Sequence, residues 1–212
     1  MRRRKLLASL LMCLSPEMWA VGDSITFGYS SGREPDYVEL LAEAFPHTHV
    51  RKIACPGATS TNAIAQTNTG LCHTGDWSNL FPVWIRPRVL IWFFGTNDPM
   101  GRWGRSRIEA DEFMDNLDTA IGRYRPDFTV VVLPPRFLAV RSTHIAETIR
   151  QSYEDEMMAN RPPWTEVVYL DDILEPEDME PLWWTLRGVH PLGSGHAKIA
   201  AQVEVLLEGK IR

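Results

Sequence analysis

Three short segments carry residues that could perform chemistry together. Gly22-Asp23-Ser24-Ile25-Thr26 follows a short apolar run, Gly95-Thr96-Asn97-Asp98 follows a longer one, and Val189-His190-Pro191 lies near the end of the 212-residue chain. A serine hydroxyl is a weak nucleophile at neutral pH and needs a base within hydrogen-bond reach. Histidine, with a pKa near ~6.5, suits that task. A serine on a strand-to-loop turn, an asparagine and a late histidine are the parts that an ester-cleaving serine hydrolase needs.

Each segment alone could have a purely structural role and take no part in chemistry. That explanation is weaker for the three segments together. Asp23-Ser24 could cap a helix or form a turn, Gly95–Asp98 could end a strand, and His190 could be a surface histidine. His196 competes for the role of base, but we expect it on the first turn of the last helix, where the helix dipole disfavours imidazolium. A metal site at His190 and His196 lacks a third ligand at a recognisable spacing. We expect neither a metal nor an organic cofactor.

The elements between these segments alternate between apolar runs and helical patterns. Helical spacing appears at 35–45, 113–124, 145–157 and 199–207, and strands are predicted at 18–21, 50–54, 88–94, 128–133 and 166–170. The run at 88–94 is continuously apolar, as a parallel strand buried on both faces should be. This alternation predicts an α/β fold, a three-layer α/β/α sandwich with a central parallel five-stranded sheet.

The predicted sheet explains how distant segments could meet. Ser24 follows the first strand, Cys55-Pro56-Gly57 the second and Gly95–Asp98 the third, and His190 lies beyond the fifth. In an open parallel sheet, ligands bind beyond the carboxyl ends of the strands. We therefore expect all four segments at one edge of the sheet.

The four segments, in this order, resemble the SGNH (GDSL-type) hydrolase superfamily, and the resemblance covers about residues 19–207. It implies a flavodoxin-like fold and a serine esterase or deacylase in which Ser24 is the nucleophile and His190 its base. It also implies an oxyanion hole formed by the backbone N–H groups of Ser24 and Gly57 and the side-chain amide of Asn97. Gly57 suits this role because an absent Cβ lets a substrate oxygen approach the backbone. The substrate would be a small-molecule, lipid or carbohydrate ester.

The sequence departs from the family pattern at Arg187. An aspartate usually stands three residues before the histidine, and arginine cannot accept the imidazole proton. Another acceptor could orient His190, and serine hydrolases retain some activity without the usual one. The candidates are a backbone carbonyl, Asp171 or Asp172 after the fifth strand, and Glu175, Glu177 or Asp178 in the next loop. Alternatively, Arg187 could bind an anionic substrate. The protein could also be a catalytically impaired carbohydrate- or lipid-binding module, or an acyltransferase using the same residues.

Composition fits one globular domain. The chain is 44% hydrophobic and 23% charged, with a net charge of −5. These fractions are ordinary for a globular protein, so we expect no integral membrane span. No basic stripe follows the first five residues, so we expect no nucleic-acid partner. We expect a leader or signal segment at 1–16 and one hydrolase-like domain at 17–212. A basic start followed by an apolar run is typical of export, but a disordered leader on a cytoplasmic protein explains it equally well. Location and oligomeric state stay open.

Three cysteines allow at most one intramolecular disulfide. Cys55 and Cys72 flank a polar, loop-like stretch, and a bond between them could staple this stretch in an exported protein. Three reduced thiols used as small hydrophobic residues are the preferred interpretation.

Overall fold

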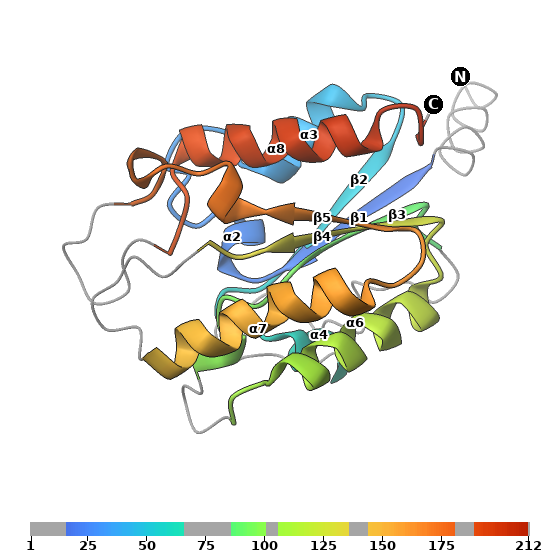
Figure 1. The fold of residues 1–212 in the computed structure, drawn as a ribbon. Helices are drawn as coiled ribbons and strands as arrows, with labels where there is room; N and C mark the ends of the chain where they lie inside the picture. Colours follow the sequence, from blue (N-terminus) through green and yellow to red (C-terminus); the bar gives the residue numbers. More distant parts are fainter. Residues whose placement is uncertain (1–15, 66–85, 101–105, 136–143, 181–188, 212) are drawn as a thin grey trace, which may run out of the picture.

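Five parallel strands form the central sheet of the protein, in the order β2-β1-β3-β4-β5 (Figure 1). The structure is a computed structural model and describes residues 16–65, 86–100, 106–135, 144–180 and 189–211. The strands are β1 (Glu17–Gly22), β2 (His49–Ala54), β3 (Val89–Phe93), β4 (Phe128–Leu133) and β5 (Thr165–Tyr169). All neighbouring strands in this sheet pair in parallel. The predicted parallel five-stranded sheet is confirmed.

Helices cover both faces of the sheet and complete the three predicted layers (Figure 1). One face carries α3 (Tyr37–Ala44) and α8 (Gly193–Leu207), and the other carries α4 (Ser60–Ala65), α6 (Ala110–Tyr124) and α7 (His144–Asn160). The four-residue helix α2 (Ser24–Phe27) leaves the end of β1. Three 3₁₀ turns complete the described elements: η1 (Asp98–Met100), η2 (Leu170–Asp172) and η3 (Pro176–Asp178).

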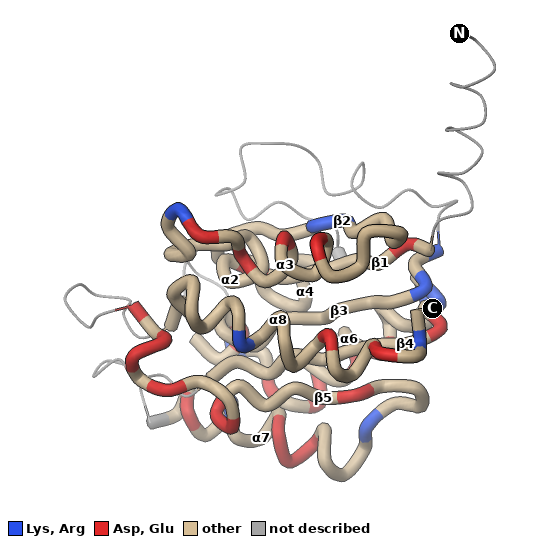
Figure 2. Tube along the Cα trace, turned by 90° about the horizontal axis from the view of Figure 1, so that it is seen from above, with Lys and Arg blue, Asp and Glu red and all other residues tan. Residues whose placement is uncertain are grey.

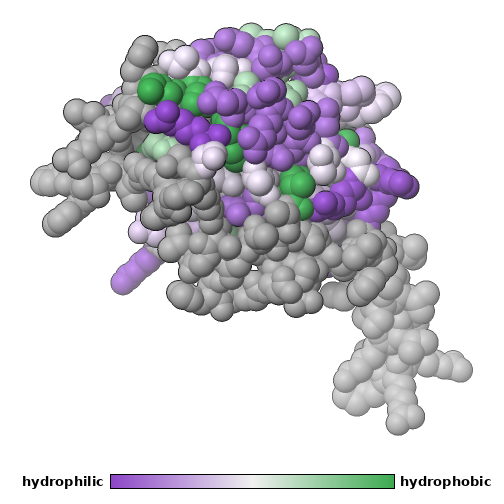
Figure 3. Space-filling model, turned by 90° about the horizontal axis from the view of Figure 1, so that it is seen from below, coloured by the Kyte–Doolittle hydropathy of each residue, from purple (hydrophilic) through white to green (hydrophobic). Residues whose placement is uncertain are grey.

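Strand β1 shows how the sheet is held between its helices. Trp19 and Val21 join the core cluster under α6 and α7, whereas Met18 and Ala20 join the cluster under α3 and α8. Successive strand side chains point to opposite faces, so a sheet buried on both sides needs apolar residues at every position. Strand β3 meets this requirement along its whole length. The outer face over α6 and α7 is largely hydrophilic (Figure 3).

The predicted strands and long helices agree with the structure, with β4 at the predicted bounds and the start of α8 differing most, at Gly193 against residue 199. The pattern did not reveal α2 and α4, which have four and six residues. Helices this short contain too few turns to show helical periodicity. Both lie beside the carboxyl ends of strands, where the chemistry-bearing segments were expected.

Charged residues are scattered over the described fold, and Figure 2 shows no continuous stripe of Lys and Arg on it. Within the same residues, no helix is long and apolar enough to cross a membrane. Cys55 is disulfide-bonded, which corrects the preference for three reduced thiols. Cys72 and the predicted leader, apart from residue 16, lie outside the described residues.

Candidate active site

Ser24 occupies the first position of α2, directly beyond the end of β1. The preceding residue, Asp23, caps this helix because its Oδ1 accepts the Ile25 N–H at 2.9 Å. Gly28 ends the helix in the left-handed conformation, with φ of 91°. A Cβ at Gly28 would also lie 2.4 Å from the Asp36 carboxylate, so glycine is required at this turn. A capped strand-to-helix turn thus fixes the serine.

His190 is the hydrogen-bond partner of this serine. The Ser24 hydroxyl lies 2.9 Å from His190 Nε2, and the two residues are only 6% and 9% exposed. The ring of Tyr29 lies beside the imidazole, with 4.8 Å between the ring centroids. Burial lowers the pKa of His190 below 6.5, and the nearby Glu180 carboxylate partly opposes that shift. The imidazole is therefore neutral near pH 7 and able to accept a proton.

Glu180 is the carboxylate beside the other ring nitrogen of His190. Its Oε1 lies 3.5 Å from Nδ1, and its Oε2 accepts a hydrogen bond from the Ser30 hydroxyl. The sequence analysis did not propose Glu180, Ser30 or Tyr29 for the site. One signal for Glu180 was available, since it is the last acidic residue before His190 in the chain.

Among the contacts described, the acids predicted to orient His190 meet other groups or solvent. Asp171 pairs with buried Arg150 at 3.3 Å, and Asp172 is exposed to solvent. After β5 the chain continues into η2 and η3, and the N–H of Glu180, two residues beyond η3, donates to the His190 carbonyl at 2.9 Å. The further candidates also face other groups or solvent: Asp178 pairs with Lys198 at 2.6 Å, and Glu175 and Glu177 are exposed. Arg187 lies outside the described residues.

The predicted oxyanion donors lie on the loops after β2 and β3. Gly57 is buried and has φ of 74°, a conformation that favours glycine. The Asn97 side-chain amide donates to the Ala58 carbonyl at 3.0 Å and to Asp23 Oδ2 at 3.3 Å. These contacts tie the loops after β1, β2 and β3 together at one edge of the sheet, as expected.

Two buried carboxyl groups support these loops. Asp23 and Asp98 are almost inaccessible to solvent, and burial raises the pKa of each from 3.8 to about 7. Asp98 accepts the Ser60 N–H at 3.0 Å and so fixes the start of α4. The two acids act on each other, since the charge of Asp23 helps to raise the pKa of Asp98.

His196, the alternative base, is a core residue. It is fully buried, its Nδ1 accepts the Tyr37 N–H at 3.4 Å, and its ring stacks on Tyr37 at 6.2 Å. Burial lowers its pKa to about 4. The hydroxyl of Ser24 is bonded to His190 instead, so the geometry favours His190 as base.

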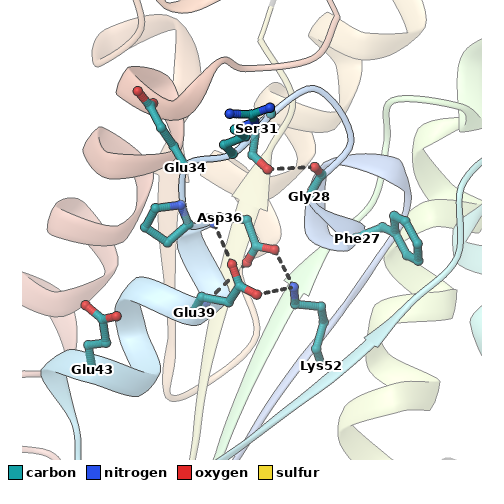
Figure 4. A pocket seen from close by; sticks show the side chains of 11 residues that line it. Phe27, Gly28, Ser31, Glu34, Asp36, Glu39, Glu43 and Lys52 are labelled. Carbon is teal, nitrogen blue, oxygen red and sulfur yellow. Dashed lines mark hydrogen bonds and ion pairs between the residues drawn. The ribbon is translucent and has the colours of Figure 1, made fainter.

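A separate open pocket lies between the segment after α2, helix α3 and strand β2 (Figure 4). Its polar groups mostly bind one another. Lys52 contacts Asp36 and, at 3.9 Å, Glu39, and the Asp36 N–H donates to Glu39 at 3.0 Å. Neither Ser24 nor His190 lines this pocket. Among the described residues, no three His, Cys, Asp or Glu side chains are grouped to hold a metal ion.

Comparisons with known proteins agree with this architecture. The model of the GDSL-like lipase/acylhydrolase family matches residues 20–198. No curated protein matches the chain in a sequence comparison. Several solved structures share its fold, each matching at least nine-tenths of both chains. A lipase/acylhydrolase from Enterococcus faecalis has a TM-score of 0.65 at 20% identity, covering 93% of this chain and 97% of its own.

Two further similar structures are named for carbohydrate esters. A carbohydrate acetylesterase family member from Sinorhizobium meliloti has a TM-score of 0.64 at 15% identity, with 92% and 99% coverage. A catalytic mutant of an acetylxylan esterase from Geobacillus stearothermophilus has a TM-score of 0.62 at 14% identity, with 92% and 94% coverage. At these identities the likeness concerns the fold.

Proposed function

Because the chain belongs to the GDSL-like lipase/acylhydrolase family, we propose that it hydrolyses carboxylic esters by acyl transfer through Ser24. One observation carries the proposal: the Ser24 hydroxyl lies 2.9 Å from His190 Nε2 in a largely buried site. This is the hydrogen bond that a nucleophile and its general base require. Exposed aromatic rings of Phe27 (51%) and Tyr29 (54%), within five residues of Ser24, offer apolar surface to a substrate.

The reaction follows from this pair. As Ser24 Oγ bonds to the ester carbonyl carbon, its proton passes to His190 Nε2, and the carbonyl oxygen becomes an oxyanion. The intermediate then breaks its bond to the alcohol oxygen, which takes the proton from the imidazolium and leaves. Water, deprotonated by His190, attacks the acyl-enzyme in the same way, and the carboxylic acid leaves as Ser24 regains its proton.

The oxyanion needs donors that are already in place. The Ser24 N–H is at the start of a helix, where backbone N–H groups have no partner within the helix. The Gly57 N–H and the Asn97 amide are the other proposed donors. Both Asn97 contacts go to protein oxygens in the free enzyme, and the one to Asp23 is longer, at 3.3 Å against 3.0 Å. We assign the N–H of the longer hydrogen bond, which points to Asp23, to the oxyanion.

The experiment replaces the nucleophile. Ser24→Ala should abolish hydrolysis of p-nitrophenyl acetate and of acetylated xylooligosaccharides, and a fluorophosphonate probe should no longer label the protein. Ser152→Ala is the matched control, because its hydroxyl bonds only to the Ile149 carbonyl of α7 among the contacts described, and it should keep both properties. Unchanged turnover by Ser24→Ala would remove Ser24 from the mechanism. Ligand binding by the wild type without labelling would favour a non-catalytic module.

A further inference from the structure

The carboxylate beside His190 comes from a part of the chain where the family pattern does not place it. We propose that Glu180 orients His190 in place of the usual aspartate, and that the Ser30 hydroxyl holds Glu180 in position. The proposal rests on the proposed function, since it assigns positioning residues to the same reaction. In the family pattern the usual aspartate stands at the position that is Arg187 in this sequence.

Backbone pairing places Glu180 opposite His190. Met179 and Pro191 form an antiparallel bridge, and the Glu180 N–H donates to the His190 carbonyl at 2.9 Å. On the other side of the bridge, the Leu192 N–H donates to the Asp178 carbonyl at 2.6 Å. The pairing fixes the two residues across from each other.

This short pairing is anchored to the rest of the fold. The Asp178 side chain pairs with Lys198 of α8 at 2.6 Å and accepts the Glu175 N–H at 2.9 Å. The segment that carries Glu180 is therefore tied to α8 through the residue two positions before it.

Ser30 approaches the carboxylate from the turn after α2. Its hydroxyl donates to Glu180 Oε2, which leaves Oε1 for His190 Nδ1. Ser30 has φ of 70°, a left-handed conformation that costs a non-glycine residue conformational energy. The Tyr29 N–H donates to the Ser24 carbonyl at 2.9 Å, so the same turn holds both the nucleophile and the carboxylate.

The arrangement fixes the tautomer of the histidine. To accept the Ser24 proton, Nε2 must carry no hydrogen, so the proton of the neutral ring sits on Nδ1, facing Glu180. Among the described residues, Glu180 from the paired segment and the Tyr29 ring from the turn lie against the imidazole, and His196 of α8 acts on it only through charge. His196 is neutral near pH 7, so Glu180 supplies the charge that stabilises the imidazolium formed during reaction.

Glu180→Gln tests the carboxylate. Because His190 then lacks the charge that favours imidazolium, kcat should fall by about 10²-fold or more, with KM little changed. The acidic limb of kcat/KM should move to lower pH, since removal of the carboxylate lowers the pKa of His190 further. Nitrogen NMR of the imidazole supplies a readout independent of turnover: the Nδ1–H tautomer should dominate in the wild type and lose population in the variant. Unchanged kcat, pH limb and tautomer would overturn the assignment.

Variants of Ser30 separate its hydroxyl from its backbone conformation. Ser30→Gly tolerates the positive φ but lacks the hydroxyl, and Ser30→Ala lacks the hydroxyl and keeps the strain. Both should lower kcat by about tenfold and move the pH limb in the direction of Glu180→Gln. Ser31→Ala is the matched control, since its hydroxyl donates to the Gly28 carbonyl of the same turn at 2.9 Å. Wild-type kinetics in Ser30→Gly would show that only the turn matters, and would overturn the role of the hydroxyl.

The outcomes also separate this proposal from the proposed function. If Ser24→Ala is inactive while Glu180→Gln behaves as the wild type, only the present inference fails. If Ser24→Ala retains turnover, the proposed function fails first. Circular dichroism and thermal unfolding of each variant show whether the protein is folded, and the tautomer measurement decides the role of Glu180 in any folded variant.

Discussion

Asp23 links two parts of the site through one carboxyl group. Its Oδ1 accepts the Ile25 N–H that starts α2, and its Oδ2 accepts an amide hydrogen of Asn97. The proposed nucleophile and the proposed oxyanion donor are therefore positioned by the same buried side chain. Asp23 favours turns and helix caps, as the sequence indicated, and the structure adds the second contact, which no local pattern could predict.

Removal of the Asn97 amide should slow the chemical step. Asn97→Ala deletes one proposed oxyanion donor, so kcat should fall by about 10²–10³, whereas KM should change little because the donor acts chiefly on the transition state. Steady-state kinetics with p-nitrophenyl acetate measure both constants.

Asn116→Ala is the control for this change. Asn116 also donates from its side chain to a neighbouring segment, to Ser60 Oγ at the start of α4 at 3.0 Å, but it lies on α6 and has no assigned role in the reaction. A loss of rate in Asn116→Ala equal to that in Asn97→Ala would mean that loop support, rather than oxyanion binding, explains the result.

At the scale of elements, Arg150 connects α7 to the ends of two strands. Its side chain is 1% exposed and pairs with Glu147 at 3.0 Å, with Glu154, and with Asp171 of η2 at 3.3 Å. It also donates to the Pro134 carbonyl after β4 at 3.3 Å. A buried cation with several partners leaves all of them uncompensated when it is removed.

Arg150→Met should therefore lower the free energy of unfolding by about 3 kcal/mol, the lower end of the range for breaking a buried ion pair, because its carboxylate partners are partly hydrated. Denaturant titration measures the change. Arg161→Met is the control, since the Arg161–Glu166 pair at 3.2 Å is exposed and should contribute less than about 1 kcal/mol. Equal effects of the two substitutions would contradict the structural role of Arg150.

Arg150 also explains why the acid partner of His190 could not be predicted. Asp171 follows β5 at the expected edge of the sheet, but the side chain that attracts it comes from a helix about 20 residues earlier. Glu180 reaches His190 through antiparallel backbone pairing of three residues on each side, which leaves no periodic pattern in the sequence. The long strands and helices were predictable because burial on one or both faces dictates their apolar spacing.

For the whole molecule, the buried acids make stability depend on pH. Burial raises the pKa of Asp98 from 3.8 to about 7, so between these values the folded protein holds a proton that the unfolded chain has released. The contribution of Asp98 to stability is fully present below about pH 4 and is lost as pH rises to about 7. Asp23 has the same direction of shift.

Asp98→Asn should remove the part of the pH dependence of stability that comes from the Asp98 carboxyl group. The neutral amide can still accept the Ser60 N–H, so the free energy of unfolding of the variant, relative to wild type, should rise between pH 4 and 7 and stay level above. Urea titrations across that range measure the difference. Asp172→Asn, which removes the charge of an exposed carboxylate, is the control for the substitution itself. A flat difference for Asp98→Asn would show that its carboxyl group titrates alike in both states.

The order of strands in the sheet has a consequence for synthesis on the ribosome. Strand β1 is the first of the sheet to emerge, yet it lies between β2 and β3, so one edge has no partner until Val89–Phe93 has been made. Unpaired apolar strand edges promote aggregation of nascent chains. Strand β1, which leads into the proposed nucleophile Ser24, is therefore the strand of this sheet that stays longest without its second neighbour, and a chaperone that shields it during translation would protect the yield of active protein.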